Sequence, residues 1–138
     1  MLLFTNNSYA IAPEVKLQDQ PIEAIVTHFA NEHGANPKVA LAVMKCESRG
    51  NQNVAPGDGG RAVGLYQFHD ETWRRLSKKY YGEVLDKHSG FDQAKVATAA
   101  IAGGDGDEWT TYRSIMNGGE YTFYSKLMKK TYTVKCKV

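Results

Sequence analysis

Apolar residues recur at helical spacing over most of the chain after residue 20. The first such stripe lies between Pro21 and Gly34, a residue suited to a left-handed helix end, and it consists of Ile22, Ile25, Val26 and Phe29. Asn36-Pro37 then supplies an N-cap and a first helical position for a second helix, which we expect to run to about Arg49. The pattern therefore predicts two consecutive amphipathic helices.

Four further helices are predicted downstream, each introduced by an acidic residue: Asp70, Asp92, Asp107 and Glu120. The residues expected to face inward are Trp73, Leu76 and Tyr80; Val96, Ala99 and Ala100; Trp109, Tyr112 and Met116; and Tyr121, Tyr124, Leu127 and Met128. Turn-forming residues dominate 50–62, the apolar run 63–68 fits a strand or a tight turn, and the alternation over 131–138 fits a strand. We therefore expect a mainly α domain of about six helices around one core, with a short strand or turn excursion near residues 50–68.

A chain of 138 residues has room for one such domain. We assign residues 1–20 to a leader or a partial export signal, 21–131 to the folded domain and 132–138 to a basic C-terminal tail. The apolar start and the sequence Ala10-Ile11-Ala12 suit an export signal, but the basic n-region and most of the apolar core of such a signal are missing. A trimmed export signal and a simple leader both stay open.

The charge pattern limits the classes of partner. A net charge of +2 is too small to indicate a nucleic-acid partner, and the one basic cluster on a predicted helix, Arg74, Arg75, Lys78 and Lys79, fits a solvated face. Five lysines without an acid mark the C-terminal stretch, which fits either a solvated tail or attraction to an anionic polymer; they are Lys126, Lys129, Lys130, Lys135 and Lys137. No run approaches the ~20 apolar residues of a membrane span, so we expect no stable membrane insertion, and we expect a monomer.

The two cysteines, Cys46 and Cys136, are far enough apart that a bond between them would stabilise the fold by about 4 to 5 kcal/mol on chain entropy. Two free thiols are the alternative. The four histidines are scattered and show no zinc-site spacing; they are His28, His33, His69 and His88. We expect neither a metal nor another cofactor.

Glu47 lies on the apolar stripe of the second predicted helix, in line with Ala40, Val43 and Met44. Burial disfavours the charged form of a carboxyl group, and so does the negative end of the helix dipole near the C-terminus. Both effects raise the pKa of Glu47, so this side chain is a candidate proton donor near neutral pH. Pairing with a buried arginine is the alternative.

The sequence motifs that contain and follow Glu47 resemble those of a known family. Cys46-Glu47-Ser48 is followed, 17 residues after the glutamate, by Gly64-Leu65-Tyr66-Gln67. This pair of motifs resembles the Glu-Ser and Gly-Leu-Met-Gln motifs of soluble lytic transglycosylases and goose-type lysozymes. With Thr72-Trp73, Asp92-Gln93 and Trp109, the pattern is also similar to the catalytic domains of resuscitation-promoting factors. The motifs span residues 36 to about 112.

The resemblance implies a lysozyme-like α+β fold, with 21–131 as the catalytic domain, and cleavage of the β-1,4 bond between N-acetylmuramic acid and N-acetylglucosamine in peptidoglycan. Glu47 would be the general acid and base, and the turn at 64–67 would line the cleft. The residues that it suggests for substrate binding are Ser48, Gly64, Tyr66, Gln67, Trp109 and Tyr112. It also implies action outside the cytoplasm, in a secreted, periplasmic, wall-associated or virion-associated setting.

Several of these roles have structural alternatives. Tyr66, where the family often has methionine, either offers its ring to a sugar or packs in the core. Trp109 fits the core better than a sugar platform, because it lies on an inward stripe. Tyr112 is either a hydrogen-bonding partner of Glu47 or a packed side chain. The chain also departs from the family pattern: the Ala-Tyr-Asn element of many transglycosylases is not evident, and Cys136 lies further from Trp109 than the last cysteine of resuscitation-promoting factors does.

The reaction depends on the number of acids. Inverting hydrolysis needs a second carboxylate at roughly 6.5 to 9.5 Å, whereas a lytic transglycosylase needs only one, because the 6-hydroxyl of the sugar attacks. The only well-placed second acid is Asp58, which also fits an ordinary Asp-Gly turn. We therefore expect a lytic transglycosylase, with a hydrolysing muramidase that uses Asp58, or a non-catalytic glycan-binding module, as alternatives.

Overall fold

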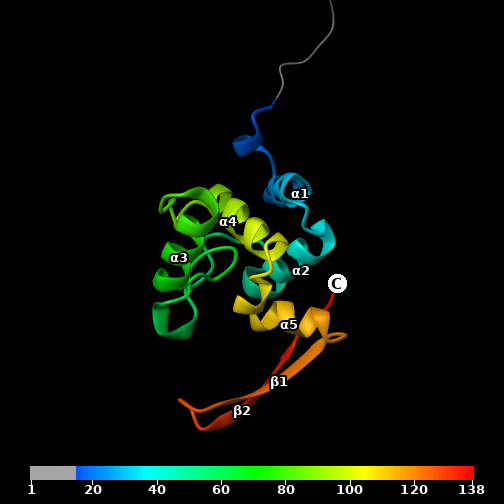
Figure 1. The fold of residues 1–138 in the computed structure, drawn as a ribbon, viewed down its shortest axis with the longest axis vertical. Helices are drawn as coiled ribbons and strands as arrows, with labels where there is room; N and C mark the ends of the chain where they lie inside the picture. Colours follow the sequence, from blue (N-terminus) through cyan, green and yellow to red (C-terminus); the bar gives the residue numbers. More distant parts are fainter. Residues whose placement is uncertain (1–14) are drawn as a thin grey trace, which may run out of the picture.

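The computed structural model describes residues 15–138, so residues 1–14 of the expected leader lie outside the described part of the chain. The described residues form five α-helices and one β-hairpin (Figure 1). The helices are α1 (Ile22–His33), α2 (Pro37–Ser48), α3 (Asp70–Tyr81), α4 (Gly90–Ala102) and α5 (Thr110–Met116), and the strands are β1 (Glu120–Ser125) and β2 (Lys130–Lys135). Short 3-10 turns lie at Leu17–Asp19, Asp58–Gly60 and Gly106–Glu108. The fold is the expected mainly helical, lysozyme-like α+β domain.

The core forms where α1 packs against α2 and α4. The alanines of α4 are fully buried at 94, 97 and 100, and their small side chains let neighbouring helices approach closely. Phe68 joins this core to the two tryptophans: its ring meets Trp73 edge-on at a centroid distance of 4.8 Å and Trp109 at 5.4 Å. Both tryptophans are therefore core residues, as their inward stripes predict.

The first two helices end and begin where the sequence predicts. Gly34 closes α1 in a left-handed conformation with φ 84°, and the Asn36 side chain caps α2 by accepting hydrogen bonds from the amides of Lys38 and Val39. The cap of α4 differs from the prediction, because the hydroxyl of Ser89 accepts from the Asp92 amide. Asp92 therefore lies in the first turn of α4, and its carboxylate accepts from the Asp86 amide instead.

The sixth helix, predicted from Glu120 to about Lys130, is wrong: this segment forms β1 and the turn of the hairpin. β1 pairs with β2 in antiparallel register, with Phe123 opposite Tyr132. The rings of Tyr121, Phe123 and Tyr132 stack on one face at centroid distances of 5.7 Å, which favours the paired strands over a helix. The side chains expected inward, Tyr124, Leu127 and Met128, are exposed.

β2 is the strand that the alternating tail predicts, and it crosses the boundary that we drew between residues 131 and 132. The chain leaves β2 towards the helical body, where a disulfide joins Cys136 to Cys46 of α2 with an S–S distance of 2.02 Å and a Cα–Cα distance of 6.2 Å. Between residues 15 and 138 no helix has the length and apolar character that crossing a membrane requires.

Candidate active site

Glu47 projects from the last turn of α2 into a cleft of about 290 Å³. The three residues that share its stripe, Ala40, Val43 and Met44, are fully buried, and Glu47 itself is partly buried at the edge of the core. The other residues that line the cleft are Gly57, Asp58, Ala62, Gln67, His69, Glu108, Trp109 and Thr110. Loop 50–68 and the start of α5 therefore face the carboxyl group across this space.

The surroundings of Glu47 favour its protonated form. Burial raises the pKa of Glu47 above its ordinary value of 4.5, and the negative charge of Asp58 raises it further. A hydrogen bond from the Thr111 hydroxyl to Glu47 Oε2, 2.7 Å long, opposes both effects because it stabilises the carboxylate. Burial is the largest contribution, so the pKa of Glu47 is raised overall.

The loop opposite Glu47 is held by amide side chains. Gln67 has a left-handed backbone, with φ 51°, and its side chain bridges two turns: Oε1 accepts from the Gly57 amide and Nε2 donates to the Gly64 carbonyl. Gln93 of α4 is fully buried and binds the loop from behind, since its Oε1 accepts from the Tyr66 amide and its Nε2 donates to the Val63 carbonyl. The two glutamines fix the backbone of the turn against the core.

Two more carboxylates line the cleft, and both have cationic or imidazole partners. Asp58 is 64% exposed, and its Oδ2 lies 2.9 Å from His69 Nε2. Glu108 accepts a hydrogen bond of 2.7 Å from Arg75 of α3. Glu47 therefore differs from its acidic neighbours: it is partly buried and its partner is a neutral hydroxyl.

A family model for transglycosylase-like domains matches residues 35–112, which is more than half of the chain. The chain belongs to this family. No curated protein and no solved structure matches the chain. The match includes Glu47, the turn at 64–67 and the start of α5, whereas the β-hairpin lies outside it. The resemblance to lysozyme-like domains that cleave peptidoglycan is therefore confirmed.

Not all of the predicted substrate-binding residues face the cleft of this transglycosylase-like domain. The ring of Tyr66 is fully buried and its hydroxyl donates to the Ala40 carbonyl, so it packs in the core and does not offer a face to a sugar. Ser48 is also buried, and its hydroxyl donates to the Met44 carbonyl of its own helix. These two predictions are corrected because both side chains satisfy their hydrogen bonds inside the protein.

Gly64 is buried and does not line the cleft. Its φ of 84° and the lack of room for a side chain explain why this residue is a glycine. A Cβ there would lie 2.2 Å from Gln93 Nε2 and 2.7 Å from Gln52 Nε2. The predicted substrate contact of Gly64 is therefore wrong, and packing against Gln93 and Gln52 is what requires a glycine at this position. Gln67 does line the cleft, with its amide engaged between the two turns.

Trp109, which lies directly before α5, and Tyr112 of α5 have different surroundings. Trp109 lines the cleft but is only 5% exposed, and its indole N–H donates to the Tyr66 carbonyl, so it serves the core. Tyr112 packs against the core, and its ring covers Gly106. The hydrogen-bonding partner of Glu47 is thus Thr111, the residue before Tyr112; no local sequence signal pointed to Thr111 or to Glu108.

The part of the chain that the structure describes contains no group of three or more histidine, cysteine, aspartate or glutamate side chains arranged to hold a metal ion. The side chains that line the cleft of the transglycosylase-like domain include three carboxyl groups, an imidazole, a hydroxyl and an amide.

Proposed function

We propose that this chain is a lytic transglycosylase that cleaves the β-1,4 bond between N-acetylmuramic acid and N-acetylglucosamine. In the first step the protonated Glu47 gives its proton to the glycosidic oxygen, and the bond from that oxygen to C1 of the muramic acid breaks. In the second step the Glu47 carboxylate takes the proton of the 6-hydroxyl of the same sugar as O6 bonds to C1. The products are a 1,6-anhydromuramyl end and a free N-acetylglucosamine hydroxyl, and Glu47 regains its proton.

The observation that carries the proposal is the environment of Glu47. A carboxyl group whose pKa is raised by burial keeps its proton at a pH where exposed acids have lost theirs, and it lies in a cleft of the family that acts on peptidoglycan. The Thr111 hydrogen bond favours the carboxylate that forms once the proton has left. The pair therefore supports both halves of the reaction.

A single acid suffices for this chemistry because the attacking hydroxyl belongs to the substrate, which gives it a high effective molarity. The exposure of Asp58 and the ion pair of Glu108 with Arg75 support this choice, since neither acid is held as a buried base. Hydrolysis by a muramidase is the second candidate, because Asp58 does line the same cleft and Asp58 with His69 would activate the water.

A non-catalytic glycan-binding module is less well supported. An acid held partly buried without a cationic partner lowers stability, and a module that only binds glycans has no need of it. Because peptidoglycan lies outside the cytoplasm, we propose that the domain acts there, as a secreted, periplasmic or wall-associated monomer.

The products of purified peptidoglycan digested with the wild-type protein and with Asp58→Asn test the proposal. We expect 1,6-anhydro ends by mass spectrometry from both proteins, since the proposed reaction does not use Asp58. Reducing ends from the wild type, together with loss of turnover in Asp58→Asn, would establish hydrolysis instead. Glu47→Gln is the control for both reactions and should form neither product.

A further inference from the structure

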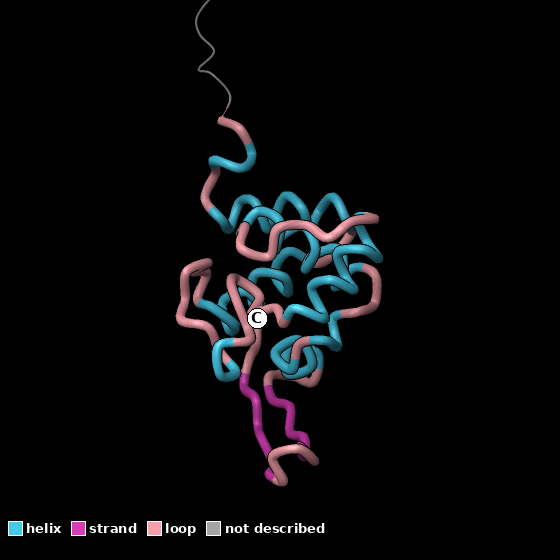
Figure 2. The backbone as a smooth tube through the Cα atoms, turned by 90° about the vertical axis from the view of Figure 1, so that its left-hand side faces the viewer, coloured by secondary structure: helices cyan, strands magenta, loops and turns pink. Residues whose placement is uncertain are grey.

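The β-hairpin projects from the helical body, as Figures 1 and 2 show from two sides. Each strand has six residues, so at about 3.3 Å per residue the hairpin extends roughly 20 Å. The turn at its tip, residues 126–129, carries two apolar side chains in water: Leu127 is 86% exposed and Met128 is 62% exposed. The segment lies outside the family match, so neither the proposed reaction nor the family accounts for it.

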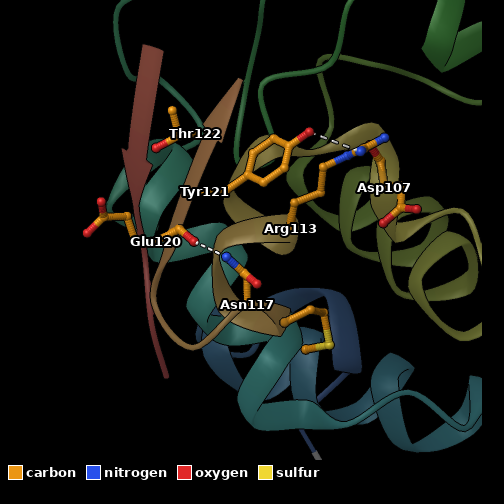
Figure 3. Close-up of a pocket in the computed structure, with 7 residues that line it drawn as sticks. Asp107, Arg113, Asn117, Glu120, Tyr121 and Thr122 are labelled. Atoms are coloured by element: carbon orange, nitrogen blue, oxygen red, sulfur yellow. Dashed lines mark hydrogen bonds between the residues drawn. The ribbon is translucent and has the colours of Figure 1, made fainter. Parts of the chain in front are cut away.

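The base of the hairpin is tied to the body on both strands. On the β1 side, Arg113 Nη1 donates to the Tyr121 hydroxyl and Asn117 Nδ2 donates to the Glu120 carbonyl, as the close-up in Figure 3 shows. On the β2 side, the Ser114 hydroxyl donates to the Cys136 carbonyl and accepts from its amide. With the Cys46–Cys136 disulfide, these contacts make the hairpin a fixed projection of the body.

Beyond Glu120 at its base, the charged side chains of the hairpin are all positive. Glu120 at the base is the last acidic residue of the chain, and five lysines follow it. Three of them flank the exposed apolar pair, Lys126 and Lys129 in the turn and Lys130 at the start of β2. Lys130 also lies over the ring of Tyr132, with its Nζ 5.4 Å from the ring centroid. The tip therefore combines two apolar side chains with a cationic rim.

We propose that this tip docks reversibly on the surface of a bilayer that contains anionic lipids. Leu127 and Met128 would enter the boundary between head groups and acyl chains, while the lysines contact lipid phosphates. An anionic wall polymer would pair with the lysines and with the rings of the hairpin, but it would leave Leu127 and Met128 in water, because sugars are bound by flat aromatic rings and hydrogen-bonding groups and not by aliphatic side chains. The charge and the apolar pair together favour a lipid surface.

Co-sedimentation with vesicles tests the proposal, using equimolar phosphatidylglycerol and phosphatidylcholine against phosphatidylcholine alone. We expect the wild-type chain to bind the anionic vesicles and to bind the neutral ones at least tenfold more weakly, because each lysine near an anionic surface contributes about fivefold. The double variant Leu127→Ser/Met128→Ser should lose about tenfold in binding to anionic vesicles. The variant Lys126→Glu/Lys129→Glu should lose more than tenfold.

Matched controls alter the body and leave the tip intact. Val84→Ser/Met116→Ser removes two exposed apolar side chains, and Lys38→Glu/Lys78→Glu changes the net charge as much as the lysine variant does. Both should bind vesicles like the wild type. Thermal unfolding of the tip variants should also match the wild type, since the changed side chains are exposed.

Three results would overturn the proposal. The tip variants could bind vesicles like the wild type, or the wild type could fail to bind vesicles and bind lipid-free wall material through the same lysines. The third is a tip that only drives self-association in sedimentation velocity. Digestion of membrane-free peptidoglycan separates this inference from the proposed reaction. Tip variants should digest it normally, and Glu47→Gln should still bind vesicles.

Discussion

Thr111 of α5 donates a hydrogen bond of 2.7 Å to the carboxyl group of Glu47 on α2, 64 residues away in the chain. The bond opposes the effect of burial, because it stabilises the charged form that burial disfavours. The proton affinity of Glu47 therefore depends on how α5 packs against α2. Changing the hydroxyl should alter the titration of the acid without removing the acid.

Replacing Thr111 by valine keeps the shape of the side chain and removes the donor. We expect the pKa of Glu47 to rise further, because the carboxylate loses its hydrogen bond while burial stays. Activity that needs the protonated acid should then persist to higher pH, so the alkaline limb of the kcat/KM profile shifts to higher pH. Thr111→Ser, which restores the hydroxyl, should return the limb to its original position, and an unchanged or downward-shifted limb in Thr111→Val would contradict this role.

Glu47→Gln should stabilise the fold at neutral pH while it abolishes activity. Burial raises the folded-state pKa of Glu47 above its ordinary value of 4.5, so stability is lost as pH rises through the folded-state pKa, where the buried carboxyl must ionise. Glutamine avoids that loss and still accepts a bond from Thr111. The melting temperature of the variant should exceed that of the wild type near pH 7, and the difference should vanish below about pH 4, where the acid is protonated in both states.

The variant Glu32→Gln is the matched control, because it removes the same charge from an exposed side chain on the surface of α1. A lower melting temperature of Glu47→Gln at pH 7, or a gain that persists unchanged to low pH, would show that Glu47 is not destabilised by ionisation in the folded state.

Gly64 and Gly59 offer a matched comparison in the loop beside Glu47. Both have a positive φ, 84° and 68°, but a Cβ at Gly64 would lie 2.2 Å from Gln93 Nε2, whereas a Cβ at Gly59 would meet nothing within 4 Å. We expect Gly64→Ala to lower the free energy of unfolding by roughly 2 to 4 kcal/mol, from backbone strain and overpacking, and Gly59→Ala by roughly 1 kcal/mol from strain alone. Equal losses in urea unfolding would show that Gln93 does not press on the turn.

The disulfide links residues 90 positions apart, so it restricts the unfolded chain strongly. Replacing both Cys46 and Cys136 by serine should lower the free energy of unfolding by about 4 to 5 kcal/mol on the chain-entropy estimate. Reduction of the wild-type protein should give a similar loss in urea unfolding, and the double variant should not respond to the reductant. Equal stability of the oxidised and reduced proteins would contradict the contribution assigned to this bond.

The helices were predictable because their signals are local. The cap at Asn36, the glycine at Gly34 and the apolar stripe that contains Glu47 are each read within a few residues, and the structure has them where the sequence predicts. The first strand of the hairpin, β1, was predicted as a helix because Tyr121, Tyr124 and Met128 happen to recur at helical spacing, whereas the alternation that follows does predict β2. Pairing with β2 determines that residues 120–125 form a strand, and a pattern read within a few residues does not contain this pairing.

The candidate site divides in the same way. Periodicity placed Glu47 at the edge of the core, since its neighbours on the stripe are apolar. The bond from Thr111 and the contacts of Gln93 with the turn join segments far apart in the chain, so no local spacing predicts them. The substrate-binding roles of Tyr66 and Ser48 were predicted from a motif. The motif does not reveal that both hydroxyls donate hydrogen bonds to backbone carbonyls in the interior.

The protonation of Glu47 can be measured directly by a carbon-detected NMR titration of its side-chain carboxyl, assigned by comparison with Glu47→Gln. We expect a midpoint above the ordinary value of 4.5, because burial outweighs the hydrogen bond from Thr111. A midpoint at or below that value would rule out Glu47 as the proton donor, since it would then have no proton to give to the glycosidic oxygen near neutral pH.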